Sequence, residues 1–235
     1  MNLLVNTVGY EKINVNSLEP FQTELELVDE FERLFDVFLG NGIHLEREFD
    51  CGFGIADAVI FKYKKNQSLL NLGKVDPEWA YTLKSLPYRK NFNIEYLCQL
   101  AGSSQASAKK AINNFIKAGY CTAKDKNTFI KNKQPRELCN SMIAIEAKLK
   151  NWKRALWQAS RYKTFASESW VVLDRRYATS AIKHIDTFKK FNIGLATFST
   201  DGSYDEHFSP KKDTHQSEIA YWKANAILAQ KLFSQ

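Results

Sequence analysis

The stretch SMIAIEAKLK, residues 141–150, decides how this chain is interpreted. Its alternation of apolar residues with other residues has the period of two that is typical of a β-strand. Successive side chains of a strand point to opposite faces, so Glu146 and Lys148 would share one face, and Ile145 and Ala147 the other. The sequence therefore predicts a strand from which an acid and a base emerge side by side.

A second acid, Asp57, interrupts the apolar run IADAVIF at residues 55–61. Burying a carboxylate in such a strand is costly unless a cation or hydrogen bonds compensate its charge. If the two strands are neighbours, Asp57 and Glu146 converge, and Lys148 lies about one strand step away. Paired carboxylates of this kind favour Mg²⁺, which prefers oxygen ligands. The alternative is that Asp57 is a strand-edge acid and that Glu146 and Lys148 form a solvent-facing ion pair.

Further helices and strands are predicted before and after these two strands. Residues 21–39 predict an amphipathic helix, with Thr23 and Glu26 as a capping box. Residues 43–49 predict a strand that pairs with residues 55–61 as a hairpin, through a turn at Gly52 and Gly54. The elements expected beyond residue 150 are a helix at 151–166 capped by Asn151, strands at 169–173 and 192–198, a helical stretch at 178–190, and a final helix at roughly 214–232. We therefore expect an α/β fold.

This order, with Asp57 on the hairpin and Glu146-x-Lys148 on the next strand, resembles the PD-(D/E)xK nuclease superfamily. The resemblance implies a restriction-endonuclease-like αβββαβ core with a mixed sheet. Gln158 and Tyr162, in WQASRY, look like the QxxxY element of the RecB-like branch; a core-edge Gln and a packed Tyr are the alternative. The likeness covers roughly residues 21–62 and 140–200, and Ala56 stands where the motif name has proline.

The resemblance implies hydrolysis of phosphodiester bonds with Mg²⁺ or Mn²⁺. Asp57 and Glu146, helped by the carbonyl of Ala147, would bind the metal, and Lys148 would be the catalytic lysine. The metal would polarise the phosphodiester and lower the pKa of a bound water, while Lys148 would orient that water or stabilise the developing charge.

The first helix of such enzymes often supplies a further acid. The segment TELELV suggests Glu24, and Glu26 and Glu30 remain possible because so short a motif does not define the register. Glu24 as an ordinary acid of a first helical turn, favoured by the helix dipole, is the alternative.

The segment between the two acidic strands is expected to be a separate domain. Residues 93–120 resemble the helix-turn-helix half of winged-helix domains, and residues 121–131 look like the wing. We therefore predict a discontinuous nuclease-like domain at 1–74 and 136–235, with a small winged-helix insertion at 75–135. The residues expected to contact DNA are Ser104, Gln105, Ser107, Lys109, Lys110, Lys124, Lys126 and Lys131.

The net positive charge of the chain is concentrated in this insertion. Residues 80–135 hold ten Lys and Arg against two acids, a surplus of eight, so in a chain of net charge +7 the remainder carries −1. A local basic excess is typical of a module that binds a polyanion. A solvated lysine-rich surface, or a winged helix that contacts protein, is the alternative.

Composition restricts the class of protein. The four cysteines are far apart, with no CxxC pair and no zinc-ligand pattern, so free thiols are expected. No apolar run approaches the roughly 20 residues of a membrane helix, and the N-terminus lacks a signal-peptide pattern, which predicts a soluble cytoplasmic protein.

The leading functional hypothesis is a metal-dependent DNA endonuclease whose winged helix binds DNA. It could act as a homodimer or within a larger defence, restriction or transposition assembly. The alternative is a catalytically inactive DNA-binding protein or transcription regulator with a nuclease-like fold.

Overall fold

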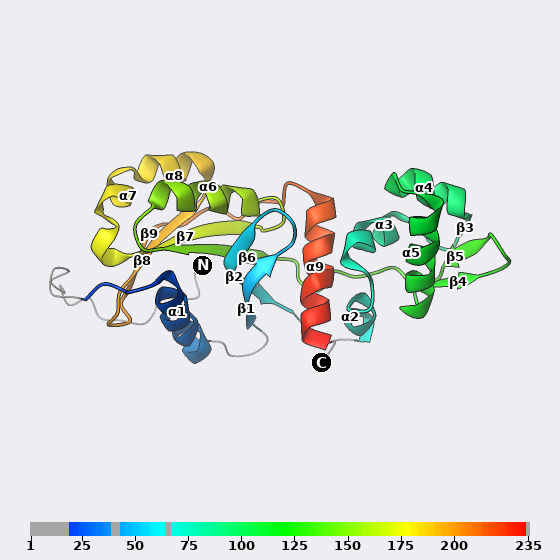
Figure 1. The fold of residues 1–235 in the computed structure, drawn as a ribbon, viewed down its shortest axis with the longest axis horizontal. Helices are drawn as coiled ribbons and strands as arrows, with labels where there is room; N and C mark the ends of the chain where they lie inside the picture. Colours follow the sequence, from blue (N-terminus) through cyan, green and yellow to red (C-terminus); the bar gives the residue numbers. More distant parts are fainter. Residues whose placement is uncertain (1–18, 39–42, 64–66, 234–235) are drawn as a thin grey trace. The chain divides into compact units, whose positions relative to one another are not determined.

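The computed structural model describes residues 19–38, 43–63 and 67–233, and it divides the chain into two compact units (Figure 1). The first unit comprises Met1–Lys62 and Ser141–Gln216, and the second comprises Tyr63–Asn140 and Ser217–Gln235. Each unit therefore combines segments that are distant in sequence.

The first unit contains a mixed six-stranded sheet in the order β1-β2-β6-β7-β8-β9. Its strands are β1 (Ile43–Asp50), β2 (Ile55–Lys62), β6 (Met142–Lys148), β7 (Glu168–Asp174), β8 (Gly194–Phe198) and β9 (Tyr204–Phe208). The pairs β6–β7 and β7–β8 are parallel, and the other three pairs are antiparallel. The expected hairpin and the α/β class with a mixed sheet are confirmed. Strand β9 was not expected, because YDEHF is short and polar.

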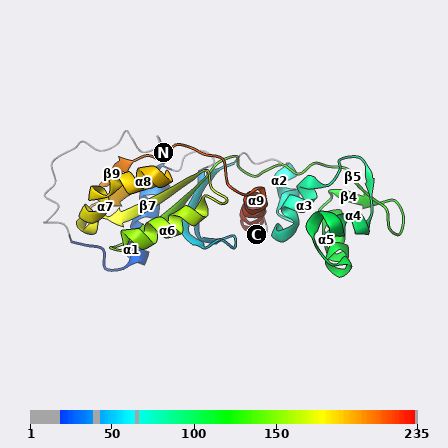
Figure 2. The ribbon, with the colours of Figure 1, turned by 90° about the horizontal axis from the view of Figure 1, so that it is seen from above.

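Helices cover both faces of this sheet (Figures 1 and 2). They are α1 (Glu24–Phe38), α6 (Trp152–Tyr162), η3 (Arg175–Tyr177), α7 (Thr179–Lys183) and α8 (Ile185–Phe191). The first helix begins where predicted, since Thr23 Oγ1 accepts the Glu26 N–H at 3.0 Å, and the Glu26 carboxylate accepts the Gln22 N–H at 2.7 Å. Asn151 caps α6 as expected by accepting the Arg154 N–H at 3.2 Å.

The alternation along β6 separates a core face from a site face. Ile145 and Ala147 belong to the apolar cluster that contains Leu27 and Phe31 of α1. Glu146 points to the opposite face, where α6 packs against β6 and β7. The same strand therefore stabilises the core with one set of side chains and presents acid and base with the other.

The second unit combines helices with a three-stranded sheet of order β3-β5-β4. Its elements are α2 (Gln67–Leu72), η2 (Pro77–Trp79), α3 (Ala80–Ser85), β3 (Asn91–Phe92), α4 (Ile94–Ala101), α5 (Gln105–Lys117), β4 (Cys121–Ala123), β5 (Phe129–Lys131) and α9 (Glu218–Phe233). Gly102 ends α4 in the left-handed conformation at φ 60°, and Ser104 caps α5 by accepting the Ser107 N–H at 3.3 Å. The helices and strands expected here are confirmed.

The second unit extends beyond the predicted insertion at 75–135. Helix α9 joins it because the helix packs against α2, η2 and α3. Asn225 of α9 accepts the Cys139 N–H at 3.0 Å, and Ala229 O lies 2.8 Å from the position that a Cβ on Gly73 would occupy. This close packing explains why the C-terminal helix is separate from the first unit.

The cysteines Cys51, Cys98, Cys121 and Cys139 form no disulfide, as expected. No helix in the described part of the chain is long and apolar enough to cross a membrane.

Candidate active site

Asp57 and Glu146 meet because β2 and β6 are adjacent antiparallel strands. Ala58 pairs with Ile145, and the same register extended by one residue brings Asp57 opposite Glu146. The Asp57 carboxylate accepts the Ala147 N–H at 2.7 Å, which anchors it to the neighbouring strand. The convergence that the two sequence patterns predicted is therefore present.

The ammonium of Lys148 lies among three carboxylates. Its Nζ is 2.9 Å from Glu24 Oε2, 3.0 Å from Glu146 Oε1 and 3.8 Å from Asp57 Oδ2. It also donates to the Ala147 carbonyl at 3.0 Å. Because only 12% of the Lys148 side chain is exposed, water screens these interactions weakly.

Glu146 is the most deeply buried acid of this cluster, with 1% of its side chain exposed. Its Oε2 accepts a hydrogen bond from the Tyr162 hydroxyl, which also lies 2.6 Å from the Ile55 carbonyl. A hydroxyl has one proton, so these two acceptors share it. Oε1 is close enough to Lys148 for an ion pair, but it has no partner in hydrogen-bond geometry.

Burial shifts the acid–base equilibria of the cluster. Desolvation and the nearby Asp57 raise the pKa of Glu146, although Tyr162 and Lys148 oppose the shift. Desolvation also raises the pKa of Asp57, against the opposing effects of the Ala147 N–H and Lys148. Burial alone would lower the pKa of Lys148, but the carboxylates of Asp57, Glu24 and Glu146 outweigh it and raise that pKa. One ammonium compensates three acids, so ionisation of all four groups would leave a charge of −2.

The donors of this cluster fit a hard divalent cation. Two carboxylates and the Ala147 carbonyl are oxygen ligands of the kind that Mg²⁺ and Mn²⁺ take, with water completing the shell. Glu146 Oε1 is a buried acceptor that still lacks a hydrogen bond. Among the residues that the structure describes, no group of three or more His, Cys, Asp or Glu is arranged to hold an ion. Lys148 is the cation that the carboxylates contact.

Helix α1 contributes Glu24 to the cluster, and the other two candidate acids lie elsewhere. Glu26 accepts the Gln22 N–H, and Glu30 pairs with Arg33 one turn away on the same helix. Of the three acids that the sequence left open, Glu24 is therefore the one that contacts Lys148.

Helix α6 places Gln158 and Tyr162 differently. Tyr162 contacts Glu146 directly, whereas Gln158 is half-buried and its Oε1 makes no hydrogen bond. Sequence reasoning missed the Ile55 carbonyl, which also contacts Tyr162. Every residue has a main-chain carbonyl, so the identity of residue 55 gives no sign of this contact.

The residues predicted to contact DNA have different surroundings in the second unit. Gln105 and Lys109 are exposed on α5, and Lys124 and Lys126 are exposed at the turn between β4 and β5. Ser104 caps α5. These four exposed side chains are accessible to a polyanion.

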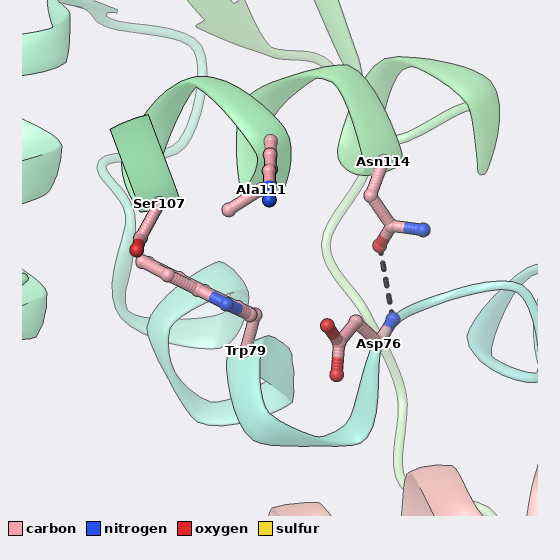
Figure 3. Close-up of a pocket in the computed structure, with 6 residues that line it drawn as sticks. Asp76, Trp79, Ser107, Ala111 and Asn114 are labelled. Atoms are coloured by element: carbon pink, nitrogen blue, oxygen red, sulfur yellow. Dashed lines mark hydrogen bonds between the residues drawn. The ribbon is translucent and has the colours of Figure 1, made fainter. Parts of the chain in front are cut away.

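Ser107 and Lys110 line a small pocket between α5 and η2, together with Asp76, Trp79, Ala111 and Asn114 (Figure 3). The side-chain amide of Asn114 is already hydrogen-bonded there: it accepts the Asp76 N–H at 2.9 Å and donates to the Lys74 carbonyl at 2.9 Å. The side of α5 that carries these residues therefore adjoins η2.

The prediction that Lys131 contacts DNA is wrong. This lysine was predicted to meet a phosphate, but it is fully buried, and its Nζ donates to the carbonyls of Leu83 and Lys84 at 3.1 and 3.0 Å. These carbonyls lie in the last turn of α3, where a helix favours positive charge. The sequence did carry a signal, because period two in β5 puts Lys131 on the face of the buried Phe129.

Comparisons with protein-family models, with curated proteins and with solved structures give no match for this chain.

Proposed function

We propose that this protein is a metal-dependent DNA endonuclease of the PD-(D/E)xK type, and that its second unit is a winged-helix domain that binds DNA. The observation that carries the proposal is the convergence of Asp57, Glu146 and Lys148 from two adjacent strands. An isolated Glu-x-Lys on a surface would lack the buried second acid and the aromatic hydroxyl that this cluster contains.

Each side chain has a distinct role in the proposed site. Asp57 and Glu146, with the Ala147 carbonyl, would hold Mg²⁺ or Mn²⁺, which when bound polarises a phosphodiester and lowers the pKa of a water ligand. Lys148 would orient the attacking water or stabilise charge on the phosphate. Tyr162 is a positioning residue because it holds Glu146, and Glu24 similarly restrains Lys148.

Two features of the second unit support the DNA-binding part. The order α3-β3-α4-α5-β4-β5 resembles that of a winged helix, in which α5 would be the recognition helix. Gln105 and Lys109 on α5, and Lys124 and Lys126 on the turn, are exposed. Contacts from such lysines to phosphates would supply affinity and salt dependence more than sequence choice.

The test is incubation of the full chain with plasmid and linear DNA in EDTA, in Mg²⁺ and in Mn²⁺. Glu146→Gln keeps the volume of the side chain and removes its charge, so we expect cleavage by wild type in metal and none by this variant. Asp186→Asn is the matched control, because that acid lies on α8 with 90% of its side chain exposed. Absence of metal-dependent cleavage, or equal cleavage by Glu146→Gln, would refute the proposal.

The second candidate is a catalytically inactive DNA-binding protein or transcription regulator built on a nuclease-like scaffold. The observation that favours it is that Lys148 already compensates the carboxylates. Calorimetric titration with Mn²⁺ separates the two: the nuclease binds Mn²⁺, and Asp57→Ala loses that binding while Asp186→Ala retains it. A wild-type protein that binds DNA but takes up no Mn²⁺ would favour the regulator.

A further inference from the structure

The helices on the two faces of the six-stranded sheet carry opposite charge. Helix α6 holds Lys153, Arg154 and Arg161 and no acid. In α1, residues 24–33 hold five acids and one base. Since DNA is a polyanion, α6 would attract it more strongly than α1. A strand that reaches Glu146 would therefore approach along α6.

Helix α6 also exposes a large aromatic side chain, because 59% of Trp157 is accessible to solvent. Of the other tryptophans, Trp79 is half-buried, and Trp152, Trp170 and Trp222 are buried. The Arg161 guanidinium lies 5.1 Å from the centroid of the Trp157 ring. No carboxylate among the described residues pairs with Arg161, so its charge is available to a phosphate.

This Trp157–Arg161 pair adjoins the acidic cluster. Arg161 Cζ lies 3.9 Å from the position that a Cβ on Gly54 would occupy, at the turn that leads into β2. Tyr162, the next residue, contacts Glu146. Trp157 is five residues before Tyr162, about 7.5 Å along the helix axis and about 140° around it. A strand with a phosphate at the carboxylates would therefore pass Arg161 before it reaches Trp157 on the exposed side of α6.

We infer that Trp157 and Arg161 form a stacking platform for an unpaired base of the strand that is cleaved. The inference rests on the proposed function and deepens it by naming the substrate class. Bases inside a duplex are covered on both faces by their neighbours, whereas an unpaired base can stack on an exposed indole while arginine contacts its phosphate. The preferred substrate is therefore DNA with a single-stranded segment, such as a flap, a gap or a frayed end.

The test measures binding of the full chain in EDTA, where cleavage is blocked, to a 20-nucleotide oligo(dT) and to a 20-base-pair duplex. We expect oligo(dT) to quench tryptophan fluorescence. Trp157→Ala should lose most of this quenching and bind oligo(dT) about 5- to 150-fold more weakly, the range for one stacked base. Its duplex affinity should stay within about twofold, because the second unit would still bind phosphates.

Two further variants sharpen the result. Arg161→Gln should reduce the slope of log affinity for oligo(dT) against log salt by about 0.7, as loss of one phosphate contact on a single strand predicts. Phe191→Ala is the control, since it removes an exposed aromatic from α8, which packs against β8 and β9 instead of β6. Equal oligo(dT) affinity for Trp157→Ala and wild type, or an equal loss in Phe191→Ala, would overturn the inference. Failure of the nuclease proposal shows separately, as no cleavage in metal.

Discussion

Replacing Lys148 with methionine should reveal the free energy held in the acidic cluster. Methionine retains most of the buried stem and removes the ammonium that lies 3.0 Å from Glu146 Oε1. Glu146 is almost completely buried, so removing its cationic partner should cost about 3–5 kcal/mol in the free energy of unfolding. The Glu24 ion pair adds at most about 1 kcal/mol, because 51% of that side chain is exposed.

The penalty should depend on pH. The pKa of Glu146 is raised by burial and lowered by Lys148, so the variant should raise it further. At pH values between the pKa of Glu146 in the unfolded chain and its higher pKa in the folded chain, the folded chain binds more protons than the unfolded chain. Stability then falls as pH rises through that window. The cost of Lys148→Met should therefore be largest near neutral and alkaline pH, and should shrink as Glu146 takes up a proton.

The assay is urea denaturation in EDTA at about pH 8 and about pH 5.5, with amide hydrogen exchange of β6 and β7 reporting on the first unit. Lys189→Met is the control, because this lysine is 53% exposed and its ion pair is with Asp186 of the same helix, so about 0.5 kcal/mol or less is expected. A cost below about 1 kcal/mol at pH 8, or an equal cost at both pH values, would refute the reasoning. In a parallel series without EDTA, Mn²⁺ should restore part of the lost stability, because the carboxylates of the proposed site would bind it in the folded state.

Three more predictions concern single contacts. Tyr162→Phe removes the hydroxyl that donates to Glu146 and should cost about 1.5–3 kcal/mol in urea denaturation; no change would mean that this bond contributes nothing. Gly194→Ala should destabilise the first unit by about 1–3 kcal/mol or more, measured by thermal unfolding, because its Cβ would lie 2.2 Å from the Trp170 ring; an unchanged Tm would contradict this packing. Burial lowers the pKa of Lys131 from 10.5 to about 8, so the unfolded chain binds the extra proton between these values and stability should rise with pH there, by up to roughly 3 kcal/mol. Lys131→Met should lack this rise in denaturation measured from about pH 7 to about pH 10, and an identical profile would exclude Lys131 as its source.

Local patterns predicted most of the helices and strands. The alternation in residues 141–150 identified β6, and Gly52 and Gly54 identified the turn of the β1–β2 hairpin. Cap residues such as Thr23 and Asn151 identified helix starts, because a side-chain oxygen that satisfies a free N–H acts within a few residues. Strand β9 escaped prediction since an edge strand needs no apolar alternation, and its pairing with β8 is a tertiary property.

The candidate site was only partly predictable for the same reason. Asp57, Glu146 and Lys148 stood out because charged residues interrupt apolar strands. The choice of Glu24 over Glu26 and Glu30 depended on which turn of α1 lies beside β6. Burial of Lys131 depended on the carbonyls at the end of α3, about fifty residues earlier in the chain.

The sequence by itself determined the periodicity, the caps, the turns and the two charged interruptions, since these depend on neighbours along the chain. Only the tertiary structure decided that β2 and β6 are adjacent, that one ammonium compensates three carboxylates, and that α9 belongs to the second unit. The physical reason is that burial and Coulomb interactions depend on distance in space, which sequence separation does not specify. The acid and base of residues 141–150 become a candidate active site when Asp57, Glu24 and Tyr162 converge on them.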